Sequence, residues 1–400
     1  MNAAAAGARR KLPEPLSVFL VAGEHSGDHL GAGLMRALRS RVDAIRFAGV
    51  GGERMMREGL HPLFPMSDIA VMGFAPVLRR LPRILRRIDD TVAAVLDARP
   101  DVLVIIDSPD FTHRVARRVR ARNPAIPIID YVSPSVWAWR PGRARAMGAY
   151  VDHVLALLPF EPEQYRRLRG PPCSYVGHPL IEQVATLRPG PAEQRRRDQQ
   201  PPVLLVLPGS RRSEIRHHLA IFGAALGRLR TQKIAFEPVL PTMPHLEHTV
   251  REGVKSWPVE PRVVLGEADK RAAFRIAHAA LAKSGTVTLE LALARVPMVA
   301  AYRAGAAEAW ILQRAINVSS IILANLVIGA NVVPEFLQND CNPEKLSQAL
   351  RDVLTDSALR RRQLEAFAGI DSIMATGDQP PSARAADIVL AAMRRAREPA

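Results

Sequence analysis

The stretch VLLVLPGSRRSEI, residues 203–215, decides how the second half of this chain is expected to fold. Its five leading apolar residues predict a strand buried in a parallel sheet, which Pro208-Gly209 then turns. A helix is expected to begin near Ser210, although Glu214 stands at capping-box distance from Arg211 instead. The start of such a helix attracts anions, and Arg211 and Arg212 add positive charge. A turn with solvated arginines and no ligand is the alternative.

A second turn of the same kind lies in KSGTVTLE, residues 283–290. The small residues Ser284, Gly285 and Thr286 open a helix, which again favours a bound phosphate. Glu290, one turn into that helix, can accept hydrogen bonds from the vicinal hydroxyls of a ribose, or it can be an ordinary solvated residue. Two such turns in one half of the chain favour a nucleotide ligand.

Bulk properties limit the class of protein. A chain of 400 residues predicts two or three domains, and 48% hydrophobic residues are enough for packed cores. The net charge of +16 predicts attraction to nucleic acid, acidic lipid surfaces or phosphorylated substrates. Cys173 and Cys341 match no metal-binding spacing, which favours reduced thiols in the cytoplasm. The first 16 residues lack the apolar core of a signal peptide, and no run is long enough to span a membrane.

The first half also reads as a doubly wound α/β domain. Residues 16–22 predict a strand, a glycine-bearing loop follows, and residues 30–38 predict a helix. The dinucleotide spacing G-x-G-x-x-G is absent, which argues against a nicotinamide site. A buried strand at 102–106 runs into Asp107 and Asp110, and the carboxyl ends of parallel strands are where such folds build their sites. Asp110 could equally cap the helix that follows.

Composition divides the chain further. We expect an N-terminal domain at 14–185, a linker at 186–202 rich in Pro, Gln and Arg, a second domain at 203–375 and a tail helix in 376–400. The sequence leaves the roles of three features undecided. The loop YVSPSVWAWR is either a packed loop or a rigid wall of a site, His178 is a loop histidine or a substrate contact, and Asn325 needs a backbone or ligand partner.

Residues 71–88, VMGFAPVLRRLPRILRRI, predict an amphipathic helix with five arginines opposite an apolar arc. Pro82 is expected to kink or interrupt it. A surface helix packed on the core is one interpretation. Because no acidic residue lies among the arginines, we favour contact with an anionic membrane surface. The residues expected to enter the membrane are Phe74, Val77, Leu78, Leu81, Ile84 and Leu85.

The sequence resembles the lipid-A-disaccharide synthase family over most of residues 16–355. Individual matching segments are short, but their number, order and spacing together are specific. They include AGEHSGDHLGAGL (22–34), GVGGERM (49–55), IIDSPDF (105–111), YVSPSVWAWR (131–140), YVGHPL (175–180), LPGSRRSEI (207–215), KSGTVTLE (283–290) and LANLVIGANVVPE (323–335).

The resemblance implies two facing Rossmann-like domains with a cleft between them, the GT-B architecture. It also implies an inverting transfer of 2,3-diacylglucosamine from its UDP derivative to the 6-hydroxyl of 2,3-diacylglucosamine 1-phosphate. Such an enzyme would act in the cytoplasm, peripherally at the inner face of the inner membrane. Neither a cofactor nor a metal is expected, because no D-x-D motif lies in a suitable place and arginine with helix dipoles can replace a divalent ion. A homodimer remains open.

The resemblance also assigns roles. In the second domain, Arg211, the backbone near Ser210 and the turn Ser284–Thr286 would hold the diphosphate, Glu290 the ribose, and Asn325 would lie near the donor. In the first domain, Asp110 stands at the position that the family motif marks for the general base, with Asp107 and Asp101 as alternatives. Glu24, a further catalytic candidate, and Ser26 would face the same cleft and orient either sugar. His178 would lie in that cleft too.

Two other functions compete with this interpretation. A UDP-sugar 2-epimerase on the same fold would share the diphosphate turns but not the basic amphipathic helix. A basic nucleic-acid-binding protein would explain the charge, but the sequence contains no recognisable binding motif and no array of aromatic residues for stacking. We therefore do not expect nucleic acid as a partner.

Overall fold

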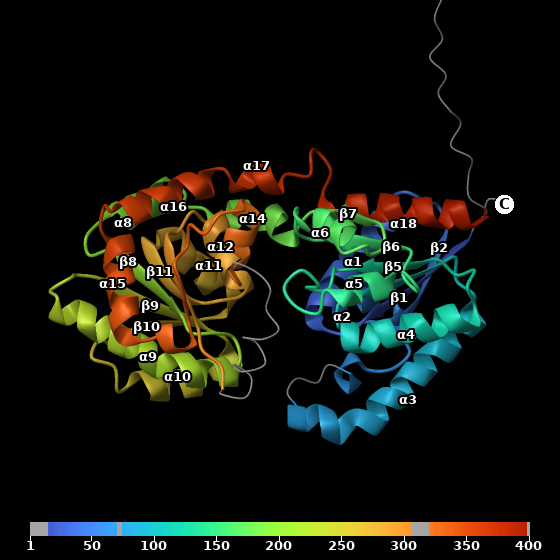
Figure 1. Ribbon diagram of the computed structural model, residues 1–400, viewed down its shortest axis with the longest axis horizontal. Coiled ribbons are helices and arrows are strands. Elements are labelled where there is room, and N and C mark those ends of the chain that lie inside the picture. The colour runs from blue at the N-terminus through green and yellow to red at the C-terminus, as the bar shows by residue number, and fades with distance from the viewer. Residues whose placement is uncertain (1–14, 70–73, 306–319, 398–400) are drawn as a thin grey trace, which may run out of the picture. The chain divides into compact units, whose positions relative to one another are not determined.

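The computed structural model describes residues 15–69, 74–305 and 320–397, with side chains of the helix that starts at Phe74 described from Leu81 onward. The chain forms two compact units (Figure 1). The first unit contains Met1–His178 together with Thr376–Ala400, and the second contains Pro179–Ala375. Each is built on its own parallel sheet with helices on the sheet faces, so the predicted α/β class is confirmed.

The first unit has a seven-stranded sheet in the order β3-β2-β1-β4-β5-β6-β7. Every strand pair in it is parallel, which is the doubly wound arrangement with its switch point between β1 and β4. The elements are β1 (Leu16–Ala22), α1 (His25–Arg39), β2 (Ile45–Val50), α2 (Glu53–Arg57), β3 (His61–Pro62), η1 (Met66–Asp68), α3 (Phe74–Ala98), β4 (Val102–Ile106), α4 (Pro109–Arg122), β5 (Ile128–Tyr131), α5 (Gly142–Met147), β6 (His153–Ala156), α6 (Glu161–Arg167), β7 (Cys173–Tyr175) and α18 (Pro381–Arg397).

Both faces of this sheet are buried, which explains the continuous apolar runs of its strands. Leu20 of β1 belongs to the core beneath α1 and α18, whereas Phe19 and Val21 belong to the core beneath α3 and α4. The two helix layers lie on opposite sides of the sheet (Figure 1). This packing leaves the carboxyl ends of β1 and β4, with the loops that follow them, to carry polar side chains.

The second unit repeats the pattern with six parallel strands in the order β10-β9-β8-β11-β12-β13, and its switch point lies between β8 and β11. The helices α9, α10 and α15 pack on one face of this sheet. The elements are η2 (Pro179–Gln183), α7 (Val184–Leu187), α8 (Pro191–Asp198), β8 (Val203–Leu207), α9 (Arg212–Thr231), β9 (Glu237–Thr242), η3 (Pro244–Leu246), α10 (Glu247–Val254), β10 (Arg262–Leu265), α11 (Gly266–Ile276), β11 (Ala279–Lys283), α12 (Thr286–Leu293), β12 (Met298–Tyr302), α14 (Leu323–Ile328), β13 (Glu335–Leu337), η4 (Gln338–Asp340), α15 (Pro343–Leu354), α16 (Ala358–Ala368) and α17 (Ile370–Met374).

The segment 186–202, expected from its composition to be the domain linker, is part of the second unit. It contains α8, which packs against α11 of the second unit. Arg197 is buried there, and its guanidinium donates to the carbonyl oxygens of Phe274 at 2.9 Å and Ala294 at 3.2 Å. Burial lowers the pKa of Arg197 to about 10. The boundary between the units therefore lies before this segment, between His178 and Pro179.

The C-terminal helix α18 belongs to the first unit, although the chain reaches it only after the second. Its apolar residues join the core beneath α1. Asp387 of α18 pairs with Arg41 at 2.7 Å, and Arg397 donates to Asp101 at 2.9 Å. The tail is thus a structural layer of the first unit.

Helix α3 differs in part from the membrane-facing helix that its sequence predicts. It continues through Pro82, and Leu81 is 37% exposed. Ile84 and Leu85, however, are half-buried and pack against the core of the first unit, so they are not free to enter a membrane. The side chains of Phe74, Val77 and Leu78 lie outside the described residues.

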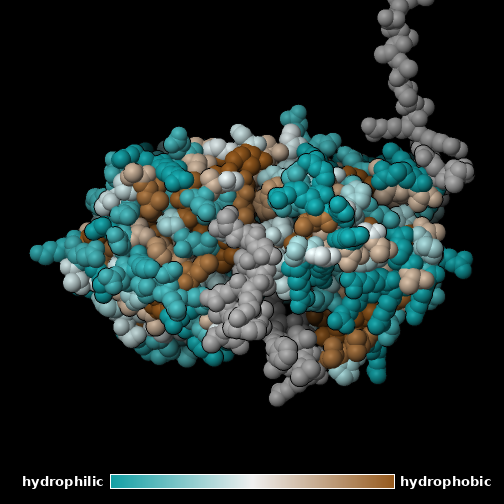
Figure 2. Space-filling model, in the orientation of Figure 1, coloured by the Kyte–Doolittle hydropathy of each residue, from teal (hydrophilic) through white to brown (hydrophobic). Residues whose placement is uncertain are grey.

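The arginines of α3 do have an acidic neighbour, outside the run itself. Arg83 and Arg87 pair with the buried carboxylate of Asp68 at 2.8 and 2.7 Å. On the face of the molecule drawn in Figure 2, polar residues predominate and apolar residues form separate patches. In the described part of the chain, no helix is both long and apolar enough to cross a bilayer.

Candidate active site

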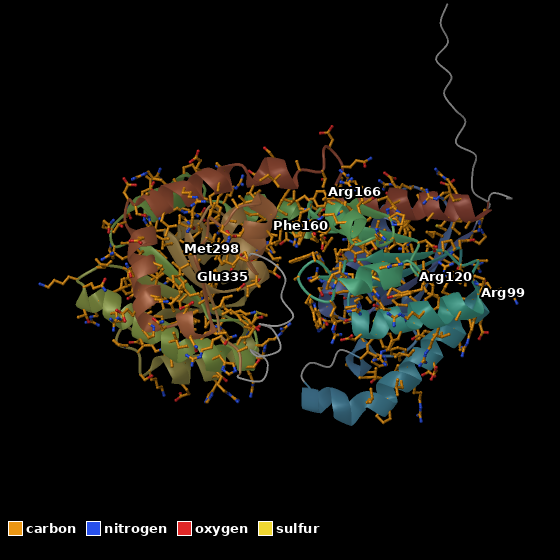
Figure 3. The ribbon with its side chains drawn as sticks, in the orientation of Figure 1. Arg99, Arg120, Phe160, Arg166, Met298 and Glu335 are labelled. Carbon is orange, nitrogen blue, oxygen red and sulfur yellow. The ribbon has the colours of Figure 1, made fainter. Side chains whose placement is uncertain are left out.

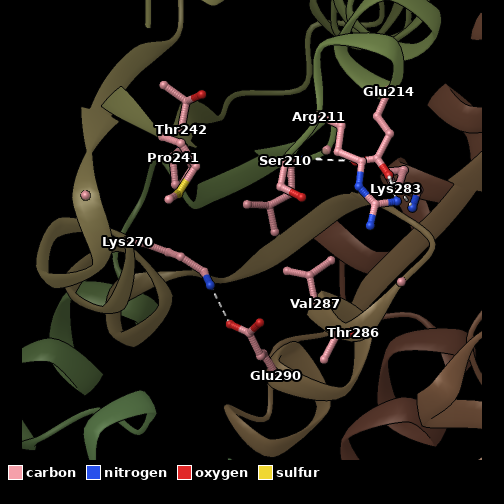
Figure 4. Close-up of a pocket in the computed structure, with 15 residues that line it drawn as sticks. Ser210, Arg211, Glu214, Pro241, Thr242, Lys270, Lys283, Thr286, Val287 and Glu290 are labelled. Atoms are coloured by element: carbon pink, nitrogen blue, oxygen red, sulfur yellow. Dashed lines mark hydrogen bonds and ion pairs between the residues drawn. The ribbon is translucent and has the colours of Figure 1, made fainter. Parts of the chain in front are cut away.

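The second unit has a pocket of about 420 Å³ at the carboxyl ends of β8 and β11. This is the switch point of the sheet, where doubly wound folds bind ligands. Figure 4 shows its walls. The lining comes from the loop after β8, the end of β9, the starts of α11 and α12, and the side chains between them: Leu207, Gly209, Ser210, Arg211, Glu214, Pro241, Thr242, Met243, Gly266, Lys270, Lys283, Gly285, Thr286, Val287 and Glu290.

Glu214 organises the turn after β8. Its carboxylate accepts a hydrogen bond from the backbone N–H of Ser210 at 2.9 Å and pairs with the Lys283 ammonium at 2.9 Å (Figure 4). Helix α9 has Arg211 as its N-cap, so Glu214 reaches back one residue beyond the usual capping-box partner. The carboxylate therefore links the two turns that the sequence singled out.

The charge state of Glu214 follows from these contacts. Burial opposes its ionisation, but the Lys283 ammonium and the Ser210 N–H outweigh burial and hold the pKa of Glu214 below its ordinary value. Behind it, His218 donates from Nδ1 to the Glu214 carbonyl at 2.7 Å and accepts from the Arg303 N–H at 3.0 Å. Burial lowers the pKa of His218 to about 4, so this imidazole is neutral near pH 7.

A second ion pair lies on the other wall of the pocket. Lys270 of α11 contacts the carboxylate of Glu290 at 2.6 Å (Figure 4), and both side chains are largely shielded. Glu290 is therefore not the solvated residue of the alternative interpretation. Together with Lys283, Lys270 places ammonium groups at a pocket that two helix N-termini also face.

Sequence reasoning brought together five residues that the structure also brings together: Ser210, Arg211, Gly285, Thr286 and Glu290. It missed Lys283, Lys270 and Glu214 as site residues. Lys283 and Glu214 lie inside the two quoted stretches. The available signal was that each stretch has a charged residue of opposite sign beside its turn. Lys270 stands on a helix with no motif, and only the fold places it at the pocket.

Two residues predicted to contact the UDP-sugar, Ser284 and Asn325, do not line this pocket. Ser284 is buried, and its hydroxyl donates to the carbonyl of Ile321 at 3.3 Å. Asn325 is also buried, and its amide is satisfied by protein. The oxygen accepts from the N–H groups of Val332 and Val333, while the nitrogen donates to Ser320 and to the Val333 carbonyl. Asn325 therefore fixes the loop before β13, and the alternative of a backbone partner is the one the structure shows.

The segment before α14 is tied to the edge strand β13. Glu335, labelled in Figure 3, accepts hydrogen bonds from the Ser320 hydroxyl at 3.1 Å and from the Ile321 N–H at 3.1 Å. Burial raises the pKa of Glu335 above its ordinary value. These contacts order the apolar segment that follows residue 319 without requiring a ligand.

In the first unit, a network of polar side chains joins the loop after β1 to the end of β4. Ser26 donates to Asp107 at 2.7 Å, and the Ser108 hydroxyl donates to Glu24 at 3.2 Å. Asp107 and Ser108 both adopt left-handed backbone angles, with φ of 57° and 45°. Strained residues of this kind concentrate at functional sites. The structure thus brings Glu24, Ser26 and Asp107 together, and the Asp107 carboxylate already accepts a hydrogen bond from Ser26.

Asp110 and Asp101 have different surroundings. The Asp110 side chain is 96% exposed in the first turn of α4, with an Arg143 nitrogen 4.0 Å away. Its side chain does not cap this helix, because the N-cap is Ser108 and no side-chain cap bond forms there. Asp101 lies at the opposite, amino end of β4, where it accepts from the Ser17 N–H at 2.8 Å. Asp101 therefore has a structural role and is removed from the candidate bases.

One residue in the first turn of α1 has a structural role too. Asp28 is buried, and its carboxylate accepts from the backbone N–H groups of Gly52, Arg54 and Met55 at the start of α2. His178, also left open by the sequence, is half-buried at the end of the first unit and does not line the pocket of the second. Burial lowers its pKa to about 4, so its imidazole is neutral near pH 7. A substrate contact by His178 stays a prediction.

The tryptophan loop 131–140 is anchored by a buried acid. Trp137 donates from Nε1 to Glu161 at 3.1 Å and packs edge-to-face on Phe160, labelled in Figure 3. The other Glu161 oxygen accepts from the Leu158 N–H at 2.9 Å. Trp139 remains 40% exposed. The loop is therefore packed against the protein at Trp137, whereas the Trp139 side chain is exposed to solvent.

Glu161 is expected to make stability depend on pH. Burial raises its pKa to about 7 against the hydrogen bonds that oppose this, whereas in the unfolded chain it titrates near 4.5. Between these values the folded state binds more protons, so the free energy of unfolding falls as pH rises through this window. The loss amounts to about 3 kcal/mol at most. Glu161→Gln cannot titrate and keeps an acceptor for Trp137.

We therefore expect Glu161→Gln to gain stability over the wild type as pH rises from about 5 to about 8, measured as denaturant midpoints at both ends of that window. Glu163→Gln, a more exposed acid on the same helix, is the matched control and should change little. Parallel pH profiles of Glu161→Gln and the wild type would contradict the assigned protonation.

Comparison with known proteins gives a consistent result. A family model described as lipid-A-disaccharide synthetase matches residues 18–379. A lipid-A-disaccharide synthase from Bradyrhizobium diazoefficiens is 70% identical over 381 residues, covering 95% of this chain and 97% of the relative. A more distant one from Rhodospirillum centenum is 48% identical and covers 94% of each chain.

A solved structure of UDP-GlcNAc 2-epimerase from Neisseria meningitidis bound to UDP-GlcNAc superposes with a TM-score of 0.60 at 13% identity, covering 95% of this chain and 100% of that one. At this identity, the likeness speaks for the fold alone.

Proposed function

The chain belongs to the lipid-A-disaccharide synthase family, whose members are glycosyltransferases. We propose in detail the reaction that it catalyses. It transfers 2,3-diacylglucosamine from UDP-2,3-diacylglucosamine to the 6-hydroxyl of 2,3-diacylglucosamine 1-phosphate. The products are the β-1,6-linked disaccharide 1-phosphate and UDP, and the anomeric carbon inverts. The observation that carries the proposal is the cationic pocket at the switch point of the second sheet, which suits a nucleotide diphosphate.

The donor site follows from that pocket. The backbone around Ser210 and the start of α12 would donate hydrogen bonds to the diphosphate. Arg211 and Lys283 supply positive charge that stabilises the departing UDP as negative charge develops on it. We assign the Glu290 carboxylate to the ribose hydroxyls and the Lys270 ammonium to a phosphate oxygen, because both side chains line the pocket and lie 2.6 Å apart.

The acceptor chemistry belongs to the first unit. An inverting transfer needs a base to take the proton of the attacking hydroxyl. Asp110 suits this role because its carboxylate is exposed and lies at the carboxyl end of a buried strand. Asp107 suits it less well, because both of its oxygens already accept hydrogen bonds, from Ser26 and from its neighbour's N–H. We assign Asp107, Glu24 and Ser26 to positioning of the loops around the acceptor.

The acylated substrates also require access to a membrane, and we assign this to α3 at the inner face of the inner membrane. Leu81 is exposed, and Arg86 is exposed on the same helix. Leu81→Ser should lower partition onto anionic vesicles by about threefold to tenfold, because an apolar side chain no longer enters the headgroup boundary. Met56→Ser, an exposed apolar residue on α2, is the control. Equal partition of the two variants would remove Leu81 from the contact.

The reaction itself is tested by mass spectrometry of products after incubation with both acylated sugars. We expect the mass of the disaccharide phosphate, with UDP released only when the acceptor is present. A UDP-sugar of unchanged mass but altered configuration at carbon 2, formed without acceptor, would instead indicate the epimerase that shares this fold.

A further inference from the structure

The first unit contains a second cavity, of about 380 Å³, which the donor chemistry does not use. Residues of α4 and α5, the helices labelled in Figure 1, line this cavity together with Arg140, and the lining is strongly basic. The charged and titratable residues that line it are Asp110, His113, Arg114, Arg117, Arg140 and Arg143. A cavity of this size accommodates a small polar headgroup.

The register of α4 produces this concentration of charge. Asp110, His113, Arg114 and Arg117 are spaced three, four and seven residues apart, which places them on one face of the helix. Arg143 of α5 faces them and donates to the Pro109 carbonyl at 3.3 Å. Four arginines thus meet one exposed carboxylate, so the cavity has an excess of positive charge that an anion would neutralise.

A buried chain of side chains holds one of these arginines in place. Arg117 donates to the Tyr150 hydroxyl at 3.3 Å and lies over its ring at 4.7 Å. The Tyr150 oxygen is 2.9 Å from Nδ1 of His113, and Nε2 of His113 is 3.3 Å from the Asp130 carboxylate. His113 and Asp130 are almost fully buried. Arg114, Arg117 and Arg140 are exposed, but Arg117 is held from beneath by Tyr150, which itself contacts the buried His113.

The hydrogen-bond directions in this chain are mutually consistent. The Tyr150 hydroxyl can donate to Nδ1 of His113 while its oxygen accepts from Arg117. Nε2 of His113 lies 3.3 Å from Asp130 Oδ2, which accepts no hydrogen bond from the described residues. Burial raises the pKa of Tyr150, so the phenol retains the proton it donates. The Tyr150 ring and hydroxyl thereby hold the Arg117 guanidinium in place before any ligand arrives.

We propose that this cavity binds the phosphomonoester of the acceptor and so selects the phosphorylated acceptor sugar. The inference rests on the proposed transferase reaction and adds the group that recognises its acceptor. Arginines in fixed geometry suit a phosphate, whose oxygens accept several charge-assisted hydrogen bonds. Asp110 lines the same cavity, so one sugar phosphate can present its anion to the arginines and its hydroxyl to the proposed base.

The test compares two acceptors, 2,3-diacylglucosamine 1-phosphate and unphosphorylated 2,3-diacylglucosamine, both in neutral detergent micelles. The wild type should prefer the phosphorylated acceptor in kcat/KM. In the double variant Arg114→Met/Arg117→Met that preference should fall by about 10-fold to 100-fold, since each substitution removes a charge-assisted contact. Activity on the unphosphorylated acceptor and UDP affinity should stay within about twofold of wild type, as should all values for the control Arg145→Met, an exposed arginine of α5 outside the cavity.

Each other outcome overturns the inference. Equal losses on both acceptors would show a general structural effect, and a wild type without preference would leave the cavity without this role even if transfer occurs. Retained preference together with weaker partition onto phosphatidylglycerol vesicles would assign the arginines to the membrane surface. If neither acceptor reacts, the transferase proposal fails by itself, and ³¹P NMR titration with glucosamine 1-phosphate still decides whether the arginines bind it.

Discussion

Replacing Asp110 by asparagine is expected to lower kcat by about 100-fold or more. Asparagine preserves the size of the side chain and its place in the first turn of α4, but it cannot accept the proton of the acceptor hydroxyl. Because the donor pocket is built entirely from the second unit, the affinity for UDP should not change. Single-turnover rates and calorimetric titration with UDP measure the two quantities separately.

Asp97→Asn is a suitable control, because Asp97 is an exposed carboxylate of the same unit on α3. Asp107→Asn is informative in another way. It weakens the contacts with Ser26 and the Ser108 N–H, so we expect a loss of stability together with a smaller loss of kcat. Normal turnover in Asp110→Asn would remove this residue from the role of base, and a larger loss in Asp107→Asn would transfer the role there.

The fold was largely predictable because buried parallel strands leave a strong signal. The apolar runs at 16–22, 102–106 and 203–207 coincide with β1, β4 and β8, the central strands of the two sheets. The short edge strands β3 and β13 were missed, because a strand of two or three residues with a single neighbour contains too few apolar positions to form a pattern.

Composition alone misjudged the segment 186–202. It has few apolar residues, which is typical of linkers, but Arg197 enters the second unit and satisfies main-chain carbonyls with its guanidinium. Both terminal nitrogens of the Arg197 guanidinium donate to backbone carbonyls, whereas Nε has no partner among the described residues. The sequence does not show where those carbonyl acceptors lie. The same limit explains Asp68, whose pairing with α3 arginines depends on a turn that no local pattern specifies.

The donor site was found by its turns and only partly by its side chains. A glycine turn before a helix identifies where an anion can bind, which is why Ser210, Arg211 and Thr286 fall on one pocket. Ser284 shows the complementary error, since adjacent residues at a strand end point in different directions and one of them must face the core. Lys270 comes from a different helix, so its place follows from the order of the strands.

Lys283→Met is expected to weaken UDP binding by about 10-fold to 100-fold. Lys283 and Glu214 are 2.9 Å apart, and each side chain is largely shielded from water. Removing the ammonium takes away a positive charge, and it also leaves the Glu214 carboxylate unpaired at the wall of the pocket where the diphosphate would lie. The two effects act in the same direction. Titration calorimetry with UDP measures the loss, and Lys345→Met, a more exposed lysine of the same unit, is the control.

The second effect can be separated from the first. Adding Glu214→Gln to Lys283→Met removes the unpaired negative charge, so the double variant should bind UDP more tightly than Lys283→Met alone, although more weakly than the wild type. The single variant should also regain affinity as pH falls, because its Glu214 loses the ammonium that kept the pKa low and becomes protonated more readily. If the double variant binds no better than Lys283→Met, Glu214 does not repel the nucleotide, and its part in the site is confined to holding the Ser210 turn.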